Sequence, residues 1–181
     1  MDAKFKKAVD KTLEHEGGYC EIKGDSGGAT NYGISLRFLK GYYPNCHLVD
    51  INNDGSVNKD DIKNLTKDDA KKIYHSQFWL KNKCDQIVDD ILAAKFFDMS
   101  VNMGLSQAAR ILQRAVGHFK LFNIVEDGKI GAKTLQAVNQ IKPDQLLCVL
   151  KKECETFYTN LATKNPELKK FLNGWLKRAD S

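Results

Sequence analysis

Three residues near the N-terminus have the types and spacing that acid–base chemistry on a sugar bond requires. They are Glu16, Asp25 and Thr30. Two carboxylates facing each other across a cleft are the minimal apparatus of a glycosidase: one protonates the leaving oxygen, and the other activates water or stabilises the charge that develops on the sugar. A threonine hydroxyl can help to hold that water. The same residue types also fit a helix cap followed by an ordinary hairpin, so both interpretations stand at this point.

The surrounding elements indicate how these groups would be positioned. Apolar residues recur at helical spacing before Glu16, which predicts a helix over residues 2–15. That pattern consists of Phe5, Ala8, Val9 and Leu13. Gly17 and Gly18 would end the helix, because glycine adopts backbone angles that other residues avoid. Glu16 would then lie at the last helical position, where the helix dipole disfavours negative charge and raises the carboxyl pKa, as a general acid requires.

Asp25 follows in a glycine-rich stretch that leaves little side-chain bulk. The glycines are Gly24, Gly27, Gly28 and Gly33. They predict a bent hairpin in which a ligand can approach the backbone closely. An aspartate in such a turn is solvated and is expected to stay ionised at neutral pH, as a base or an electrostatic partner must. The alternative is that Asp25 only caps the turn through its own backbone.

The order of residues here resembles a known family. His15-Glu16-Gly17-Gly18-Tyr19, followed by D-S-G-G-A-T-N-Y-G-I over residues 25–34, is similar to the opening of glycoside hydrolase family 108, the N-acetylmuramidases of phages and bacteria. The resemblance implies that Glu16 is the catalytic acid and that Asp25 and Thr30 line the cleft. It also implies a mainly α-helical, lysozyme-like fold with one small β-hairpin near the N-terminus, and peptidoglycan as the partner, with no cofactor needed for catalysis.

Further similarities to this family supply candidate substrate contacts. Ala70 to Trp79 has its A-x-x-I-Y-x-x-x-F-W pattern. Tyr32, Tyr74 and Trp79 are candidates to stack against a sugar, although Trp79 and Tyr74 also fit a helix core. Asp98 and Asn102 lie four residues apart, hence on one face of an apolar helix expected over residues 87–103. Because a buried acid needs a partner, structural pairing that holds the hairpin is the favoured interpretation, and contact with substrate is the alternative.

The second half of the chain resembles predicted peptidoglycan-binding modules. Residues 106–117 predict a helix that begins at a serine cap and ends at glycine. Residues 127–135 have the D-G-x-I-G-x-x-T-L pattern of such modules, and residues 171–178 have the F-x-x-G-W-x-x-R ending of the family. We therefore expect a catalytic region over residues 1–104 and a helical peptidoglycan-binding-like region over residues 105–181. No Pro- or Ser-rich linker separates them, which predicts that they pack as one unit.

A twelve-residue loop over residues 50–61 resembles an EF-hand calcium loop inserted in the first region. Its oxygen ligands fall at the expected positions: Asp50, Asn52, Asp54, Asn58 and Asp61. Gly55 occupies the sharp-turn position, whereas Asp61 is one methylene shorter than the usual glutamate. A structural calcium ion is the favoured prediction, and a solvated turn rich in Asp and Asn is the alternative. A calcium sensor would need paired loops, and only one is present.

Composition restricts the class of partner. The chain has 181 residues, 42% apolar content and a formal net charge of +5, which favours a polyanionic partner such as a bacterial wall. Its charges are too dispersed to favour nucleic acid. No apolar run is long enough for a transmembrane helix, and five cysteines without a C-x-x-C motif argue against zinc.

The N-terminus shows no secretory signal, so we expect synthesis in the cytoplasm and action at the cell wall or periplasm, with a holin or an export system providing passage. The sequence as a whole predicts a peptidoglycan hydrolase of endolysin type that cleaves the β-1,4 bond between N-acetylmuramic acid and N-acetylglucosamine. The alternative is a non-catalytic wall-binding or secretion-accessory protein. Glu16 favours the enzyme, because a protein that only binds does not need it.

Overall fold

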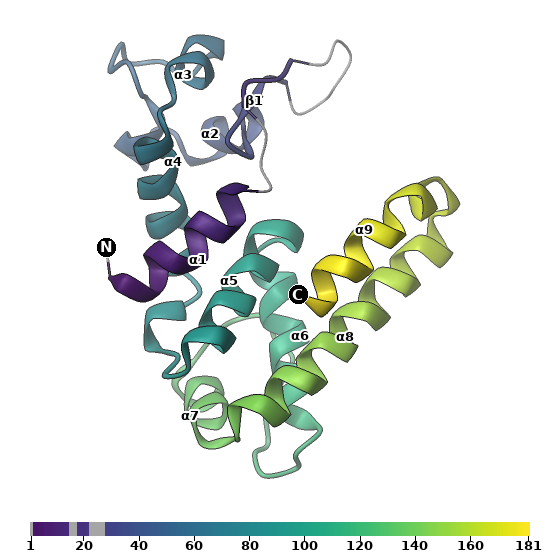
Figure 1. Ribbon diagram of the computed structural model, residues 1–181. Coiled ribbons are helices and arrows are strands. Elements are labelled where there is room, and N and C mark those ends of the chain that lie inside the picture. The colour runs from purple at the N-terminus through teal and green to yellow at the C-terminus, as the bar shows by residue number, and fades with distance from the viewer. Residues whose placement is uncertain (1, 15–17, 22–27) are drawn as a thin grey trace. The chain divides into compact units, whose positions relative to one another are not determined.

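The computed structural model describes residues 2–14, 18–21 and 28–181 (Figure 1). The chain divides into two compact units, Met1–Leu80 and Lys81–Ser181. Within the described residues, the regular structure is helical except for one two-stranded antiparallel hairpin in the first unit. This confirms the prediction of a mainly α-helical fold with a small hairpin near the N-terminus. None of the described helices is long and apolar enough to cross a bilayer.

The first unit holds its N-terminal helix by aromatic contacts of Phe5. Its elements are α1 (Ala3–Glu14), β1 (Thr30–Asn31), β2 (Ile34–Ser35), α2 (Leu36–Tyr42), the 3-10 turn η1 (His47–Val49), α3 (Lys59–Asn64), α4 (Lys67–Tyr74) and the π-helical turn η2 (His75–Trp79). The buried ring of Phe5 contacts His75 and Trp79 edge-on, with ring centroids 4.7 and 5.5 Å apart. These contacts join α1 to η2. The helix expected over residues 2–15 is thus present through Glu14.

Helix α4 begins where the sequence predicts. Thr66 is its N-cap, and the Thr66 side chain accepts a hydrogen bond from the Asp69 backbone N–H at 3.2 Å. The Asp69 carboxylate reaches back to the Thr66 backbone N–H at 3.4 Å, which completes a capping box. The helix buries Ala70, Ile73 and Tyr74 and then widens into η2.

The second unit is helical, and its helix over residues 105–117 contacts the helices over residues 90–103, 132–140 and 143–164. Its elements are the 3-10 turn η3 (Cys84–Gln86), α5 (Asp90–Met103), α6 (Leu105–Gly117), α7 (Ala132–Gln140), α8 (Pro143–Lys164), the 3-10 turn η4 (Pro166–Leu168) and α9 (Lys169–Asp180). Helix α5 is apolar nearly all round and buries residues on most of its surface. Pro143 opens α8 at the first helical position, as predicted. Helices α8 and α9 run back along each other as a helical hairpin (Figure 1).

Two helix starts differ from the prediction. Ser106 was the expected cap of α6, but the N-cap is Gly104, whose φ of +84° turns the chain directly out of α5. Ser106 therefore lies inside the first turn. A Cβ at Gly128 would come within 2.5 Å of its Oγ, so the turn after α6 requires glycine there. Helix α3 was not predicted, because the polar residues of the preceding loop obscure its short pattern.

Candidate active site

Thr30 lies on β1, a short strand that forms backbone hydrogen bonds on both of its edges. β1 and β2 pair antiparallel, with Thr30 opposite Ser35. The turn residues Tyr32 and Gly33 have φ values of 48° and 74°, which is the pattern of a two-residue type I′ turn. On its other edge, Thr30 exchanges two backbone hydrogen bonds of 2.8 Å with Cys20. The Thr30 backbone is thus held between two neighbouring segments.

Asn31, which sequence reasoning missed, and Tyr74 fix this hairpin to the helices of the first unit. Asn31 is only 6% exposed, and its Nδ2 donates to the carbonyl oxygens of Ile62 at 3.0 Å and Leu65 at 3.3 Å. The Tyr74 hydroxyl donates to the Tyr32 carbonyl oxygen at 3.0 Å. A buried amide must find such partners. The signal in the sequence is an asparagine inside a two-residue strand, where its side chain has to point inward.

Glu16 and Asp25, the predicted acid and second carboxylate, lie outside the described residues. Their roles therefore stay predictions.

The three aromatic candidates lie in different surroundings. Trp79 is 0% exposed and Tyr74 is 1% exposed, so both rings belong to the core of the first unit. A ring with no exposed face cannot stack against a sugar, so the burial of Trp79 and Tyr74 favours the core interpretation over a substrate contact. Tyr32 is partly exposed at the hairpin turn and stays a candidate contact.

Asp98 and Asn102 lie on α5 in the second unit. The Asp98 carboxylate accepts hydrogen bonds from the Arg178 guanidinium at 2.8 Å (Nη2 to Oδ1) and 3.1 Å (Nε to each oxygen). Both side chains are about one-quarter exposed, 23% for Arg178 and 24% for Asp98. Asn102 is exposed, and its Nδ2 donates to the Asp98 carbonyl oxygen at 2.7 Å. The structural pairing expected for Asp98 is present, but its partner is α9 rather than the hairpin.

A buried lysine strengthens the same junction. Lys95 is 6% exposed, and its Nζ donates to the carbonyl oxygens of Arg178 at 2.7 Å and Ala179 at 2.6 Å. These carbonyls belong to the last turn of α9, where a positive charge is favourable. The end of α9 is thus held to α5 by two cationic side chains.

We expect Asp98→Asn to lower the free energy of unfolding by about 1–3 kcal/mol, because it removes the charge from a partly buried, bidentate pair. Thermal unfolding measures this loss. Asn102→Ala is the matched control, since Asn102 is exposed one turn further along α5 and should be nearly neutral. Equal stability of the Asp98→Asn variant and the wild type would contradict a structural role for the pair.

The predicted calcium loop is closed by its last residue. Asp61 is fully buried. Its Oδ1 accepts the backbone N–H of Ile51 at 2.8 Å, and its Oδ2 accepts that of Asn58 at 2.8 Å. Asp61 also completes the capping box that starts α3 with Asn58 as N-cap. The shorter side chain of aspartate thus serves loop closure and helix capping at once.

Of the remaining candidate ligands, Asn52 and Asp54 are exposed, and Asp50 and Asn58 are half-buried. Asp50 accepts the backbone N–H groups of Asp54 at 3.2 Å and Gly55 at 3.0 Å. Hydrogen bonds from the Ser56 hydroxyl and then from Asn52 lower the pKa of Asp54, so this carboxylate stays ionised, as a calcium ligand must. Across the described residues, no group of three or more His, Cys, Asp or Glu side chains converges to hold a metal. Calcium binding stays a prediction that requires Asp50 and Asp54 to turn toward a common centre.

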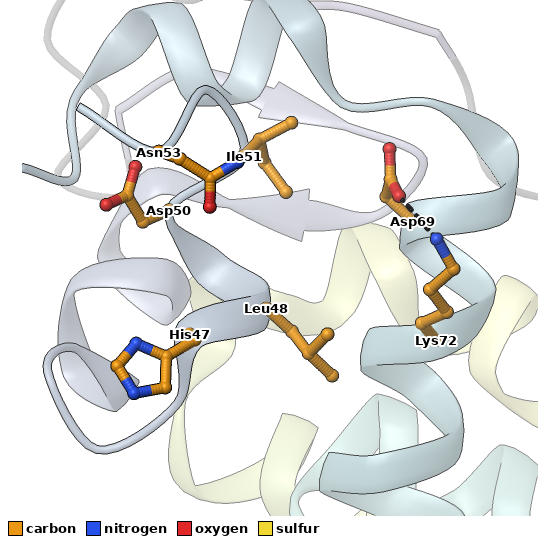
Figure 2. A pocket seen from close by; sticks show the side chains of 7 residues that line it. All are labelled: His47, Leu48, Asp50, Ile51, Asn53, Asp69 and Lys72. Atoms are coloured by element: carbon orange, nitrogen blue, oxygen red, sulfur yellow. Dashed lines mark hydrogen bonds and ion pairs between the residues drawn. The ribbon is translucent and has the colours of Figure 1, made fainter. Parts of the chain in front are cut away.

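A small pocket of about 150 Å³ adjoins the start of this loop (Figure 2). Its lining residues are His47, Leu48, Asp50, Ile51, Asn53, Asp69 and Lys72. The Asp69 carboxylate is already paired with Lys72, at 3.1 Å, and with the cap of α4. Two of the polar side chains that line the pocket are therefore committed to each other.

Comparison with known proteins assigns the chain to a family. Residues 9–104 match the family model described as glycosyl hydrolase 108, and residues 107–180 match the one described as a predicted peptidoglycan domain. Among solved structures, that of Brucella abortus SagA is similar, with 31% sequence identity and a TM-score of 0.77. The alignment covers 97% of this chain and 89% of that chain. A search of curated proteins found no match.

A glycosyl hydrolase region followed by a peptidoglycan domain defines the class of protein, a peptidoglycan hydrolase. The chain belongs to the glycosyl hydrolase 108 family. The expected family, the lysozyme-like helical fold and peptidoglycan as a partner are thus confirmed.

Proposed function

We propose that this chain is an N-acetylmuramidase that cleaves the β-1,4 bond between N-acetylmuramic acid and N-acetylglucosamine. Glu16 protonates the leaving oxygen. Asp25 activates water or stabilises the oxocarbenium-like transition state, and Thr30 helps to hold that water. The proposal is supported above all by the match to the glycosyl hydrolase 108 family over residues 9–104, a range that contains all three residues.

The stereochemical course depends on the distance between the two carboxylates. A separation of roughly 6.5–9.5 Å leaves room for a water molecule and gives inversion, whereas roughly 5–5.5 Å gives a covalent intermediate and retention. In both courses Glu16 must be protonated when substrate binds, and Asp25 must be ionised.

Purified peptidoglycan provides the test. Incubation with the wild-type chain should lower its turbidity, and each cleaved bond should release one reducing sugar end. Turbidity loss that instead releases new amino groups would indicate cleavage of the peptide part. Binding to peptidoglycan without any release would favour the non-catalytic wall-binding or secretion-accessory alternative.

The proposed site of action is the cell wall or periplasm, in the manner of an endolysin. Passage to the wall then requires a holin or an export system. The partner in that compartment is a polymer that carries peptide carboxylates, which the net charge of +5 favours.

We further propose that the loop Asp50–Asp61 binds one structural calcium ion. Calcium should raise the melting temperature, because a ligand that binds only the folded state stabilises it by ~2.7 kcal/mol at a hundredfold excess over Kd. Differential scanning fluorimetry in millimolar calcium and in chelator measures the shift, and Asp54→Ala should remove it. Identical melting in calcium and in chelator would exclude a stabilising site. Chelation should lower activity only through stability, because the loop supplies no proposed catalytic group.

A further inference from the structure

Helix α9 contains an interior glycine that no contact among the described residues requires. Gly174 lies in the middle of Lys169–Asp180, with no positive φ. A glycine there weakens the helix relative to alanine, because it loses more backbone freedom on folding. A Cβ built at Gly174 meets no atom within 4 Å in the part of the chain that the structure describes. Internal packing therefore does not explain the missing side chain, and the helix backbone at Gly174 is open to a partner from outside.

The residues one turn away from Gly174 on the same helix face are aromatic and cationic. They are Lys170, Phe171, Lys177 and Arg178. Phe171 is 48% exposed, and the Lys170 ammonium lies 5.0 Å from the centre of its ring. Lys170 and Lys177 are exposed, whereas Arg178 is committed to Asp98. The open position at Gly174 is thus bordered by an aromatic ring and two lysines.

Helix α8 holds the aromatic side of this surface in place. The ring of Trp175 stacks on the buried Tyr158 of α8, with centroids 5.2 Å apart and planes at 23°. Phe171 lies beside Trp175, with centroids 5.8 Å apart. Rings fixed in this way lose little conformational entropy when a ligand binds to them. Trp175 keeps part of its surface exposed.

The charge of the chain is concentrated in the unit that carries this surface. Acidic and basic side chains balance in Met1–Leu80, so the formal net charge of +5 falls entirely in Lys81–Ser181. Peptidoglycan combines sugar rings, whose apolar faces pack on aromatic side chains, with peptide carboxylates that attract lysines. A glycan strand together with its attached peptides therefore fits both the rings and the charges around Gly174.

We propose that the surface formed by Lys170, Phe171, Gly174, Trp175 and Lys177, here called the Gly174 surface, is where the second unit binds the glycan strand of peptidoglycan. A sugar ring packs against Phe171 and the bare backbone at Gly174, and the two lysines face the peptide carboxylates. The inference rests on the proposed function, and it assigns specific residues to the peptidoglycan domain.

The Gly174→Ala variant gives the sharpest test, because stability and binding should change in opposite directions. An added methyl group stabilises the helix and should raise the melting temperature by about 2–4 °C. The same methyl group occupies the space of the ligand and should weaken binding to insoluble peptidoglycan about tenfold. Pelleting at low temperature over a short incubation measures binding with little cleavage. Binding equal to that of the wild type would overturn the proposal.

Gly41→Ala in α2 is the matched control, since a Cβ at Gly41 also meets open space in a helix. It should leave peptidoglycan binding unchanged. A loss as large as that of Gly174→Ala would show that the binding effect is not specific to α9 and would overturn the assignment. Phe171→Ala should weaken pelleting at least as much as Gly174→Ala, because it removes the exposed ring.

The same variants would also detect two other possible ligands of the Gly174 surface, an anionic lipid and a second copy of the chain. Binding of the wild type to vesicles of phosphatidylglycerol that Phe171→Ala abolishes, with peptidoglycan binding intact, would assign the surface to anionic lipid and overturn the proposal. A dimer in solution that Gly174→Ala dissociates would assign it to a second copy of the chain. A wild type that neither binds nor cleaves peptidoglycan would contradict the proposed function itself. Normal cleavage by the wild type, with variants that bind peptidoglycan as tightly as the wild type does, would contradict only this inference.

Discussion

Replacement of Glu16 by glutamine is expected to lower the rate of peptidoglycan cleavage by about 10²–10⁴-fold. Glutamine preserves the size of the side chain but cannot supply the proton that the leaving oxygen needs. The fold should be unaffected, because the substitution is nearly isosteric. Turbidity loss of purified peptidoglycan at saturating substrate measures the rate, and thermal melting checks the fold. A variant that keeps more than a tenth of wild-type turnover would remove Glu16 from the role of acid.

Glu21→Gln is the matched control for this prediction. Glu21 is another glutamate close in sequence, but it is exposed and paired with Lys59 and with the Tyr19 hydroxyl. The Lys59 ammonium, followed by the Tyr19 hydroxyl, lowers the pKa of this carboxyl, so it stays ionised and cannot act as an acid. An exposed ion pair contributes little to stability. Activity near the wild-type level is therefore expected, and an equally large loss would show that glutamate substitution here disturbs the hairpin rather than the chemistry.

The second large effect is expected at Asp25. If Asp25 is the second carboxylate, Asp25→Asn should lower kcat by about 10²-fold or more with little change in melting temperature. If Asp25 only caps its turn, asparagine makes the same turn, and activity and stability should both survive. Steady-state kinetics together with thermal melting separate these two outcomes.

An active Asp25→Asn variant would direct the search to another acid. Asp98 is the next candidate, but its carboxylate is held by two nitrogens of Arg178. A catalytic Asp98 would have to release that pair, so Arg178→Lys should then change kcat as well as stability. A change in stability alone would leave Asp98 in its structural role.

Helix starts and helix ends that depend on residues close by in the sequence were predicted well. The capping box of Thr66 and Asp69, the proline at the start of α8 and the glycine at the end of α6 all depend on residues within one helical turn. The hairpin was also expected, because the glycine-rich stretch before Ile34 permits its turn. In each case the local backbone geometry admits few residue types, so the residue types reveal the geometry.

Features fixed by distant contacts were not predicted. Asp98 pairs with a residue 80 positions away, and no local pattern could identify Arg178 as its partner. Trp79 is of a residue type that often stacks on sugars, but it is buried in the core, where its ring contacts Phe5 of α1 edge-on. The family resemblance named the correct residue types at these positions without showing which of them face solvent. Burial depends on how the helices pack, and only the structure supplies that packing.

The sugar at the newly formed reducing end tests the central claim most directly. Peptidoglycan digested by the wild-type chain is reduced with borohydride, and the fragments are identified by mass spectrometry. Cleavage of the proposed bond should leave N-acetylmuramic acid at the new reducing end, which borohydride then reduces to its alditol. The Glu16→Gln variant should produce almost none. Fragments that end in reduced N-acetylglucosamine, or that have no reducible end, would contradict the account.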